Sequence, residues 1–142
     1  MNKISICIPT YNRAKYLKNC LNSIIHNQNF LNQNVEVCIS DNYSSDETES
    51  VVRHAQNKID IKYNKNDKNL GIPQNFIKVV DMAEGEFVWL IGDDDLLMPN
   101  ALCDLNKIID DNNDVEFFYV NSYHLTSEYV FSYDQPFDIK NL

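Results

Sequence analysis

Glycine is scarce in this sequence. The chain has 142 residues and only three glycines, and none of them lies in Pro9–Tyr16, directly after the first strand-like segment. A nucleotidyltransferase that activates sugars would need a glycine-rich, basic phosphate loop at that place. A dinucleotide-dependent dehydrogenase would need the GxGxxG pattern there. The sequence therefore disfavours both classes of α/β nucleotide-binding enzyme.

Paired cysteines and long apolar runs are also lacking. The four cysteines show no metal-finger spacing, and we expect reduced, structural thiols at Cys7, Cys20, Cys38 and Cys103. No run approaches the roughly 18 apolar residues of a membrane-spanning helix. The first residues lack the layout of a signal peptide, so a cytoplasmic location is the default expectation.

Positive charge is in deficit. The net charge is −9, which argues against nucleic acid as the main partner because duplex binding needs a basic face. An acidic protein that binds a phosphorylated ligand needs a local source of positive charge. A divalent cation is the obvious candidate for that role.

Strand-like and helix-like segments alternate along the chain, which predicts an α/β fold with a mostly parallel sheet and helices on both faces. The expected strands are Ile4–Ile8, Val35–Ser40, Ile59–Tyr63, Glu86–Ile91 and Val115–Val120. Glu86–Ile91 is the most hydrophobic and is expected to lie centrally. Helices are expected from Ala14 to about His26, after the capping residues 44–47, from Gly71 to Gly85 and after Pro99. Gly85 is expected to end its helix in a left-handed conformation.

Ligands of such sheets bind at the carboxyl ends of the strands. The loops expected at that edge are Pro9–Arg13, Asp41–Asp46, Asn64–Gly71 and Gly92–Asp95. They are the most polar and least helix-like stretches of the chain. We therefore expect a binding site where these loops meet.

Three adjacent carboxylates, Asp93, Asp94 and Asp95, follow the most hydrophobic strand. They repel one another unless they are solvated or neutralised. A hard cation such as Mg²⁺ or Mn²⁺ binds one or two carboxylates and completes its coordination with water and substrate phosphates. A metal held here could stabilise a departing diphosphate. The alternative is a solvated acidic loop.

Other residues of these loops have two interpretations each. Asp41 and Asn42 could bind a base or ribose, or form an Asx turn before a helix cap. Tyr11 could frame a base, or belong to a plain turn. Asn69 and Gly71 could bring the backbone close to a phosphate, or simply join a loop to a helix.

Taken together, these sites resemble the family 2 glycosyltransferases of the GT-A (Rossmann-like) fold. The matching stretches are ISICIPTYNR, VEVCISDNYSSDET, NKNDKNLGIPQNF and GEFVWLIGDDDLLMP, which cover about residues 3–109. The resemblance implies that Thr10 and Tyr11 line the base pocket and that Asp41 contacts the base. The nucleotide-binding residues would be Pro9, Thr10, Tyr11, Arg13, Asp41, Asn42, Asn69, Gly71 and Asp93.

The acidic motif departs from the family pattern. Aligning Leu-Leu-Met-Pro with the family motif places Gly92 where an aspartate usually stands. Asp93 then falls at the ribose side, Asp94 becomes the metal ligand, and Asp95 is the reserve choice.

The resemblance also implies a function. It predicts transfer of a sugar, with inversion, from a nucleoside-diphosphate donor to a glycan or lipid-linked acceptor in the synthesis of bacterial surface polysaccharides. A lipid-linked acceptor would place the protein at the inner face of the membrane.

The acceptor site and the catalytic base of the family lie further along the chain, and no candidate base follows Val120. We expect residues 1–120 to form the nucleotide-sugar-binding domain of a chain truncated at its carboxyl end. Residues 121–142 begin an acceptor-side region or form an unassigned tail. The alternative function is donor binding without catalysis.

Overall fold

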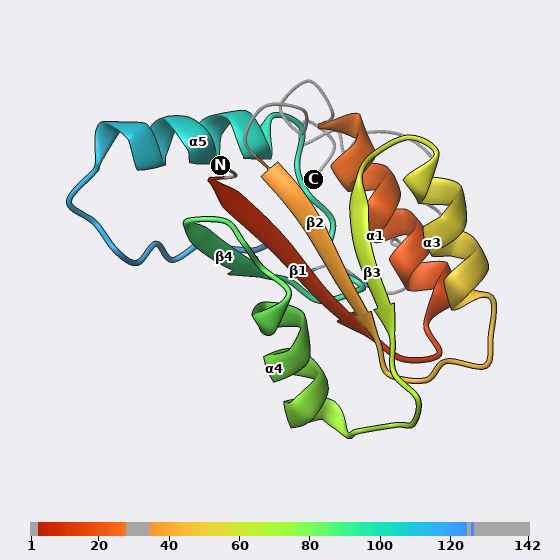
Figure 1. The fold of residues 1–142 in the computed structure, drawn as a ribbon. Helices are drawn as coiled ribbons and strands as arrows, with labels where there is room; N and C mark the ends of the chain where they lie inside the picture. Colours follow the sequence, from red (N-terminus) through yellow and green to blue (C-terminus); the bar gives the residue numbers. More distant parts are fainter. Residues whose placement is uncertain (1–2, 28–34, 125, 127–142) are drawn as a thin grey trace.

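A computed structural model describes residues 3–27, 35–124 and 126. Four parallel strands form a sheet in the order β3-β2-β1-β4 (Figure 1). The strands are β1 (Ile4–Thr10), β2 (Val35–Asp41), β3 (Ile61–Lys65) and β4 (Phe87–Leu90). The helices are α1 (Ala14–His26), α3 (Thr48–Gln56), α4 (Ile72–Asp81) and α5 (Ala101–Asp111). The predicted α/β class with a parallel sheet is confirmed.

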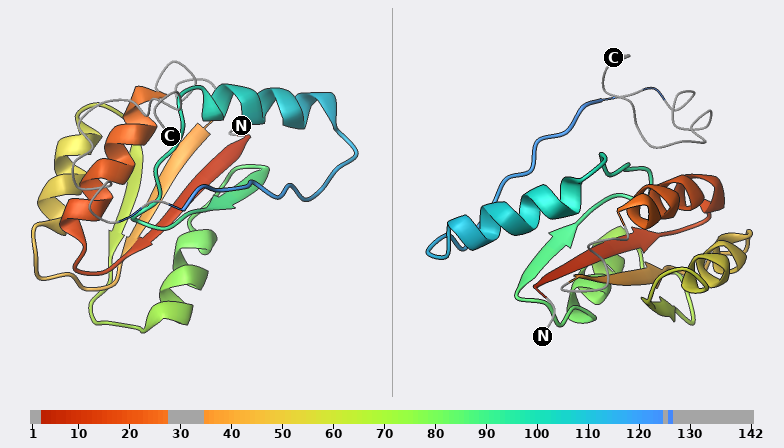
Figure 2. Two further views of the ribbon diagram at one scale, coloured as in Figure 1. Left: turned by 180° about the vertical axis from the view of Figure 1, so that it is seen from behind. Right: turned by 90° about the horizontal axis from the view of Figure 1, so that it is seen from above.

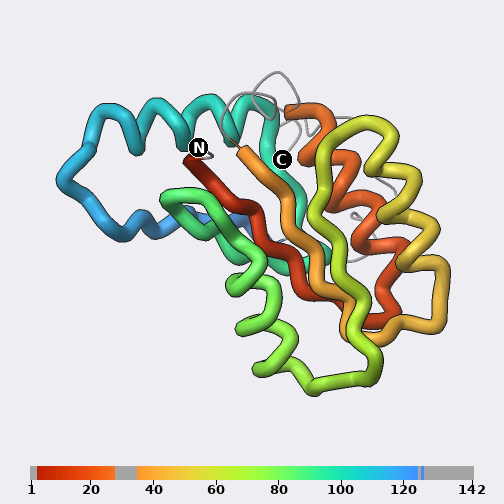
Figure 3. Tube along the Cα trace, in the orientation of Figure 1, coloured from red at the N-terminus to blue at the C-terminus, as the bar shows by residue number. Residues whose placement is uncertain are grey.

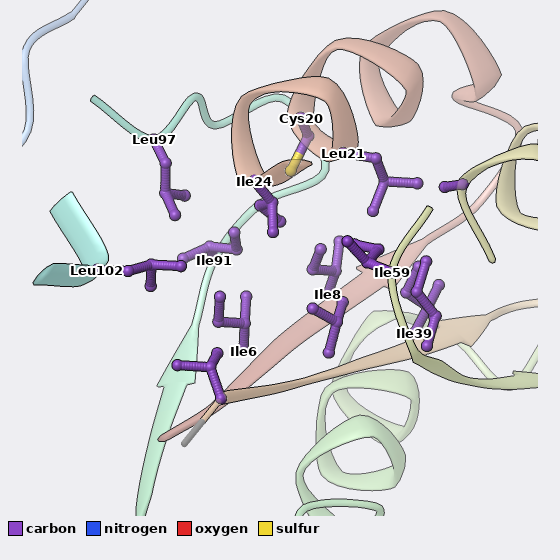
Figure 4. Packing of buried hydrophobic residues seen from close by; sticks show 14 of the residues in the cluster. Ile6, Ile8, Cys20, Leu21, Ile24, Ile39, Ile59, Ile91, Leu97 and Leu102 are labelled. Atoms are coloured by element: carbon purple, nitrogen blue, oxygen red, sulfur yellow. The ribbon is translucent and has the colours of Figure 1, made fainter. Parts of the chain in front are cut away.

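The main core lies on one face of the sheet. Helices α1, α3 and α5 cover this face, and α4 lies on the other (Figure 2). Successive strand residues point to opposite faces, so Ile6 and Ile8 of β1 both enter the core. There they point toward Leu21 and Ile24 of α1 (Figure 4). Within the described residues, no helix has the length and apolar character needed to cross a membrane.

The face toward α4 holds a smaller cluster. Cys7 and Cys38 are paired in the β1–β2 register and are buried with Val79 of α4. All four cysteines of the chain are free. Cys7, Cys20 and Cys38 are buried, as expected of structural thiols, whereas Cys103 is only partly buried.

Strand β4 does not lie centrally, contrary to the prediction. Among the described residues it pairs only with β1 and forms one edge of the sheet. Phe87 and Trp89 pack on the main core, whereas Val88 and Leu90 are 45% and 40% exposed on the other face. Because both faces of β4 are apolar, the sequence suggested that the strand is buried on both sides. Helix α4, however, packs on β1 and β2 and leaves the outer face of β4 exposed.

The fifth strand predicted over Val115–Val120 is also wrong, because the structure has no strand there. Phe118 packs edge-on against Phe87, with ring centroids 5.6 Å apart. Phe117 and Tyr119 are 80% and 83% exposed. The alternating pattern thus places one aromatic ring against the core face of β4 rather than extending the sheet.

Helix α4 ends at Asp81 and not at Gly85 as predicted. Gly85 does not have a positive φ, so it is not a left-handed helix end. Glycine is needed there because the chain passes close to β1. A Cβ atom at this position would lie 2.8 Å from the backbone nitrogen of Ser5.

A buried carboxylate stabilises this crossing at the amino-terminal end of the strands. Glu36 of β2 accepts hydrogen bonds from the Ser5 hydroxyl and from the N–H groups of Glu84 and Gly85, and it forms an ion pair with Lys62. Burial alone would raise the pKa of Glu36, but the bonds from Lys62, Ser5 and Glu84 outweigh it and lower the pKa to about 2. The folded state therefore favours the charged form.

Glu36→Gln is expected to lower the free energy of unfolding by about 1–3 kcal/mol at pH 7. Because the pKa of about 2 lies below the ordinary value of 4.5, charged Glu36 stabilises the fold above pH 4.5. That stabilisation is lost as the pH falls toward 2. Urea unfolding of both proteins should therefore show a difference at pH 7 that shrinks at pH 3. Glu49→Gln, at an exposed ion pair with Arg53, should change stability little.

Candidate functional site

The loops after the four parallel strands meet at one edge of the sheet. The strands point the same way, and the tube trace shows the turns after β1, β2 and β3 gathered at their carboxyl ends (Figure 3). Hydrogen bonds and ion pairs connect the loop after β1 to the loops after β2 and β4. The structure thus brings together the segments that the sequence analysis singled out.

Thr10 and Arg13 of the first loop bind the acidic loop after β4. The Thr10 hydroxyl donates to Asp93 Oδ2 at 2.8 Å. The Arg13 guanidinium lies between two carboxylates, with Nε 3.0 Å from Asp93 Oδ1 and an Nη 2.7 Å from Asp94 Oδ2. It also stacks on Tyr16, with Cζ 4.3 Å from the ring centroid. Arg13 is therefore an internal counter-ion of the acidic loop.

Asp93 differs from its two neighbours in burial. It is 6% exposed, whereas Asp94 and Asp95 are both exposed. Burial raises the pKa of Asp93 to about 6, although the Thr10 hydrogen bond and the charge of Arg13 act in the opposite direction. A carboxylate in this setting is stabilised in its charged form by any further cation at the loop.

Gly92 allows the acidic loop to fold back on itself. The Asp95 carboxylate accepts the N–H of Gly92 at 2.7 Å. A Cβ atom on Gly92 would lie 2.7 Å from Asp94 Oδ1, so the aspartate usual in the family would displace that carboxylate. The Asp94 side chain, which is 50% exposed, would have to rotate if residue 92 carried a Cβ atom.

The acidic loop suits a cation that takes few protein ligands. Within the described ranges, no three His, Cys, Asp or Glu side chains are grouped so that they could hold a metal ion. Mg²⁺ needs only one or two carboxylates when phosphate oxygens and water supply the rest. Asp94, whose side chain is 50% exposed, and the exposed Asp95 fit that donor set.

Asp41 lies below the surface of the site. Its side chain is fully buried. Oδ1 accepts the N–H of Ser44 at 2.8 Å, and Oδ2 accepts the Tyr63 hydroxyl at 2.8 Å. Burial, the bond to Asp41 and its charge raise the pKa of Tyr63, which keeps this hydroxyl a donor. The Asp41 side chain therefore bonds the backbone three residues further on, one residue beyond the Asx turn that was the alternative interpretation.

Asn42 uses both ends of its carboxamide to bind the loop after β3. Its Nδ2 donates to Asn69 Oδ1 at 2.9 Å and to the carbonyl of Gly71 at 3.3 Å. Its Oδ1 accepts the N–H of Leu70 at 2.8 Å and Nδ2 of Asn66 at 3.2 Å. Asn42 is only 3% exposed, so it shapes the site from within.

The remaining predicted residues lie at the surface or in the strand end. Tyr11 is 44% exposed, and Asn69 and Gly71 are exposed. Pro9 is buried beside Ser40 in the β1–β2 register. A ligand at this edge can therefore reach Tyr11, Asn69 and Gly71 directly.

Sequence reasoning missed several residues that hold the site together. Those that bind across loops or strands are Asn12, Ser44, Asp46, Tyr63, Asn66 and Asn75. The sequence analysis gave Ser44 and Asp46 only as helix-capping residues, and the signal for Asn66 was the density of asparagine after β3. Tyr63 gave no signal, because its contact with Asp41 depends on the strand register.

Comparison with known proteins identifies related sequences. The model of the family described as "Glycosyl transferase family 2" matches residues 5–134. An abequosyltransferase of Salmonella typhimurium is 43% identical over 114 residues, which cover 79% of this chain and 34% of that protein. A poly(ribitol-phosphate) β-N-acetylglucosaminyltransferase of Staphylococcus aureus is 35% identical over 114 residues, covering 80% of this chain and 20% of that protein. The chain thus spans about a third of the length of the first relative and a fifth of the second.

Solved structures share the fold. S. aureus TarS in complex with UDP-GlcNAc superimposes with a TM-score of 0.71 at 34% identity, over 78% of this chain and 32% of that one. A mannosyltransferase of Pyrobaculum calidifontis in complex with GDP-Man and Mn²⁺ has a TM-score of 0.64 at 23% identity, over 75% of this chain and 31% of that one. The likeness to the mannosyltransferase concerns the fold alone. The predicted GT-A fold is confirmed.

Proposed function

The chain belongs to glycosyl transferase family 2, and from this premise we propose that the carboxyl edge of its sheet binds a nucleoside-diphosphate sugar together with Mg²⁺ or Mn²⁺. The sugar would be transferred to a glycan or lipid-linked acceptor in the synthesis of bacterial surface polysaccharide. The names of an abequosyltransferase and of a glucosyltransferase acting on an undecaprenol-linked glycan, both at 43% identity, support this substrate class. A lipid-linked acceptor would bring the protein to the membrane surface.

The observation that carries the proposal is the contact between the first and fourth loops. Thr10 and Arg13 bind Asp93, and Arg13 also binds Asp94. The loop that we propose to bind the base is thereby held beside the acidic loop. A nucleoside diphosphate needs such an arrangement, because its base and its diphosphate lie at opposite ends of the ribose.

In this proposal the base lies against Tyr11, the exposed aromatic ring of the first loop. Asp93 takes over the ribose contact of the family aspartate that Gly92 replaces. A contact between Asp41 and the base stays a prediction. Each carboxylate oxygen can accept a second hydrogen bond, but Asp41 is fully buried, so the base reaches it only if the groups that cover it move aside.

Asp94 is the proposed metal ligand, and Asp95 is the alternative ligand. When bound there, a divalent cation neutralises the diphosphate and stabilises it as a leaving group. Arg13 then retains Asp93 as its partner and keeps that buried carboxylate charged. Asn69 and Gly71 present carboxamide and backbone groups at the surface, where they can contact the ribose or the phosphates.

Calorimetric titration with UDP, CDP, dTDP and GDP, with and without Mn²⁺, tests the proposal. We expect one nucleotide to bind, and to bind more tightly with metal. Binding that does not depend on metal would contradict the proposed role of the acidic loop but would still support a base-binding site. A folded chain that binds none of the four, with or without metal, contradicts the proposal.

Transfer is tested separately with the same donor and a glycan acceptor. Release of nucleoside diphosphate that depends on the acceptor supports a transferase. Tight donor binding without turnover supports the second candidate, a donor-binding unit. This candidate is supported by the length of the matched region, which is 34% of one relative and 20% of another.

A further inference from the structure

We propose that Asn12 and Asp46 are positioning residues that fasten the loop after β1 to the loop after β2 and thereby set the affinity of the donor site. We call their contacts the cross-loop clasp. The inference rests on the proposed function, because it concerns the same nucleotide site. Neither residue needs to touch the nucleotide for this role.

Asn12 forms the first half of the clasp. Its N–H donates to the Ser44 hydroxyl at 2.8 Å, and its Oδ1 accepts the N–H of Ser45 at 2.8 Å. Asn12 has φ +51°, a left-handed conformation that few residues other than glycine and asparagine adopt readily. Asparagine is thus suited both to the turn and to the contact across it.

Asp46 forms the second half. Its Oδ2 accepts the N–H of Ala14, the first residue of α1, at 3.0 Å. Its Oδ1 accepts the hydroxyl of Thr48 at 2.6 Å and the Thr48 N–H at 3.1 Å. A single carboxylate therefore serves the starts of both α1 and α3. Arg13, the residue before α1, makes no capping hydrogen bond to the helix with its side chain.

The clasp lies between the residues that the proposed function uses. Tyr11 and Arg13 flank Asn12 in the first loop. In the second loop, Ser44 accepts from Asn12 and also donates its N–H to Asp41. A shift of one loop against the other would therefore move the Tyr11 ring and the Arg13 guanidinium away from Asp41.

The solvent exposure of the clasp residues distinguishes a role in ligand affinity from a role in the stability of the fold. Asn12, Ser45 and Asp46 are exposed, so water can replace part of their hydrogen bonding. The donors to Asp46, Ala14 and Thr48, are buried, and Asp46→Asn should therefore cost more stability than Asn12→Gly. Ligand affinity should be more sensitive than stability to loss of these bonds. Loops that are no longer held in place must be ordered when the ligand binds, and this ordering costs binding free energy. The clasp should consequently influence nucleotide affinity more than folding.

The test uses three variants and one control. Asn12→Gly keeps the left-handed turn and removes the carboxamide, whereas Asn12→Asp keeps the acceptor oxygen. Asp46→Asn has the same shape but only one accepting oxygen, so it cannot serve both helices. Glu36→Gln, in the network at the opposite end of the strands, destabilises the fold away from the site.

Nucleotide affinity with Mn²⁺ is measured by calorimetry, and stability by urea unfolding. We expect Asn12→Gly and Asp46→Asn each to weaken binding about tenfold, and Asn12→Asp to stay within about threefold of wild type. Glu36→Gln should bind as wild type although it is less stable. Hydrogen exchange at the Ser45 N–H in Asn12→Gly, and at the Ala14 N–H in Asp46→Asn, should be faster than in wild type.

The two proposals fail in different ways. If wild type binds nucleotide and Asn12→Gly and Asp46→Asn bind within about twofold of it, the clasp has no positioning role and the donor site stands. Equal weakening by Glu36→Gln would also overturn the clasp, because affinity would then follow stability. A wild-type chain that binds no nucleotide overturns the donor site, and the clasp inference with it.

Discussion

Asp94→Asn is expected to weaken metal-dependent nucleotide binding by about two orders of magnitude, because a bridging cation contributes several kcal/mol to holding a diphosphate. The variant keeps the size of the side chain and removes its charge. The side chain is 50% exposed, so the fold should tolerate the change. The dissociation constant with Mn²⁺ should rise to the value that wild type shows without metal.

Asp95→Asn and Asp114→Asn are the matched controls. Asp95 is the neighbouring carboxylate and also accepts the Gly92 N–H, so its replacement should have a smaller effect on metal dependence. Asp114 is exposed beyond α5, and its replacement should have none. If Asp95→Asn removes metal dependence and Asp94→Asn leaves it intact, the metal ligand is Asp95 instead.

Asn42→Ala is expected to lower the free energy of unfolding by about 2–4 kcal/mol, because it removes every hydrogen bond that this buried carboxamide makes to the loop after β3. The structure assigns Asn42 four hydrogen bonds with the loop after β3. The loss should therefore appear both in urea unfolding, followed by the fluorescence of the single tryptophan Trp89, and in faster hydrogen exchange of the Leu70 N–H.

The same variant separates two roles for Asn42. If the carboxamide only shapes the loop, nucleotide binding should weaken in step with the loss of order at Leu70. Asn113→Ala, at an exposed asparagine, should change neither stability nor binding. A stable Asn42→Ala protein with an ordered loop and lost nucleotide binding would mean that Asn42 contacts the ligand directly.

Hydrophobic pattern along the chain was enough to predict most of the helices and strands, but not the order of the strands in the sheet. Hydrophobic periodicity identified the first four strands and the helices, because each element has its own period. Strand order depends on which helix crosses which strand. The apolar residues of β4 suggested a central strand, yet Val88 and Leu90 face outward beside α4. Phe118 likewise contributed to a strand-like pattern of apolar residues, although in the structure its ring packs on the core face of the sheet.

The loops of the site could be predicted, but not how they are joined. Parallel strands bring their carboxyl ends together whatever their order, so the positions of Thr10 and of the acidic residues followed from topology. The contact of Tyr63 with Asp41 depends on the β2–β3 register. The bond from Ala14 to Asp46 spans 32 residues of sequence. No local pattern carries such information.

Paramagnetic broadening by Mn²⁺ in amide NMR spectra, recorded with the nucleotide that binds, tests the central claim most directly. Broadening falls off steeply with distance from the ion. We predict that the signals of Gly92–Asp95 are lost first, that those of Thr10–Arg13 follow, and that the Glu36 signal is unaffected. Broadening centred elsewhere, or unchanged in Asp94→Asn, would contradict a metal-assisted donor site at this edge of the sheet.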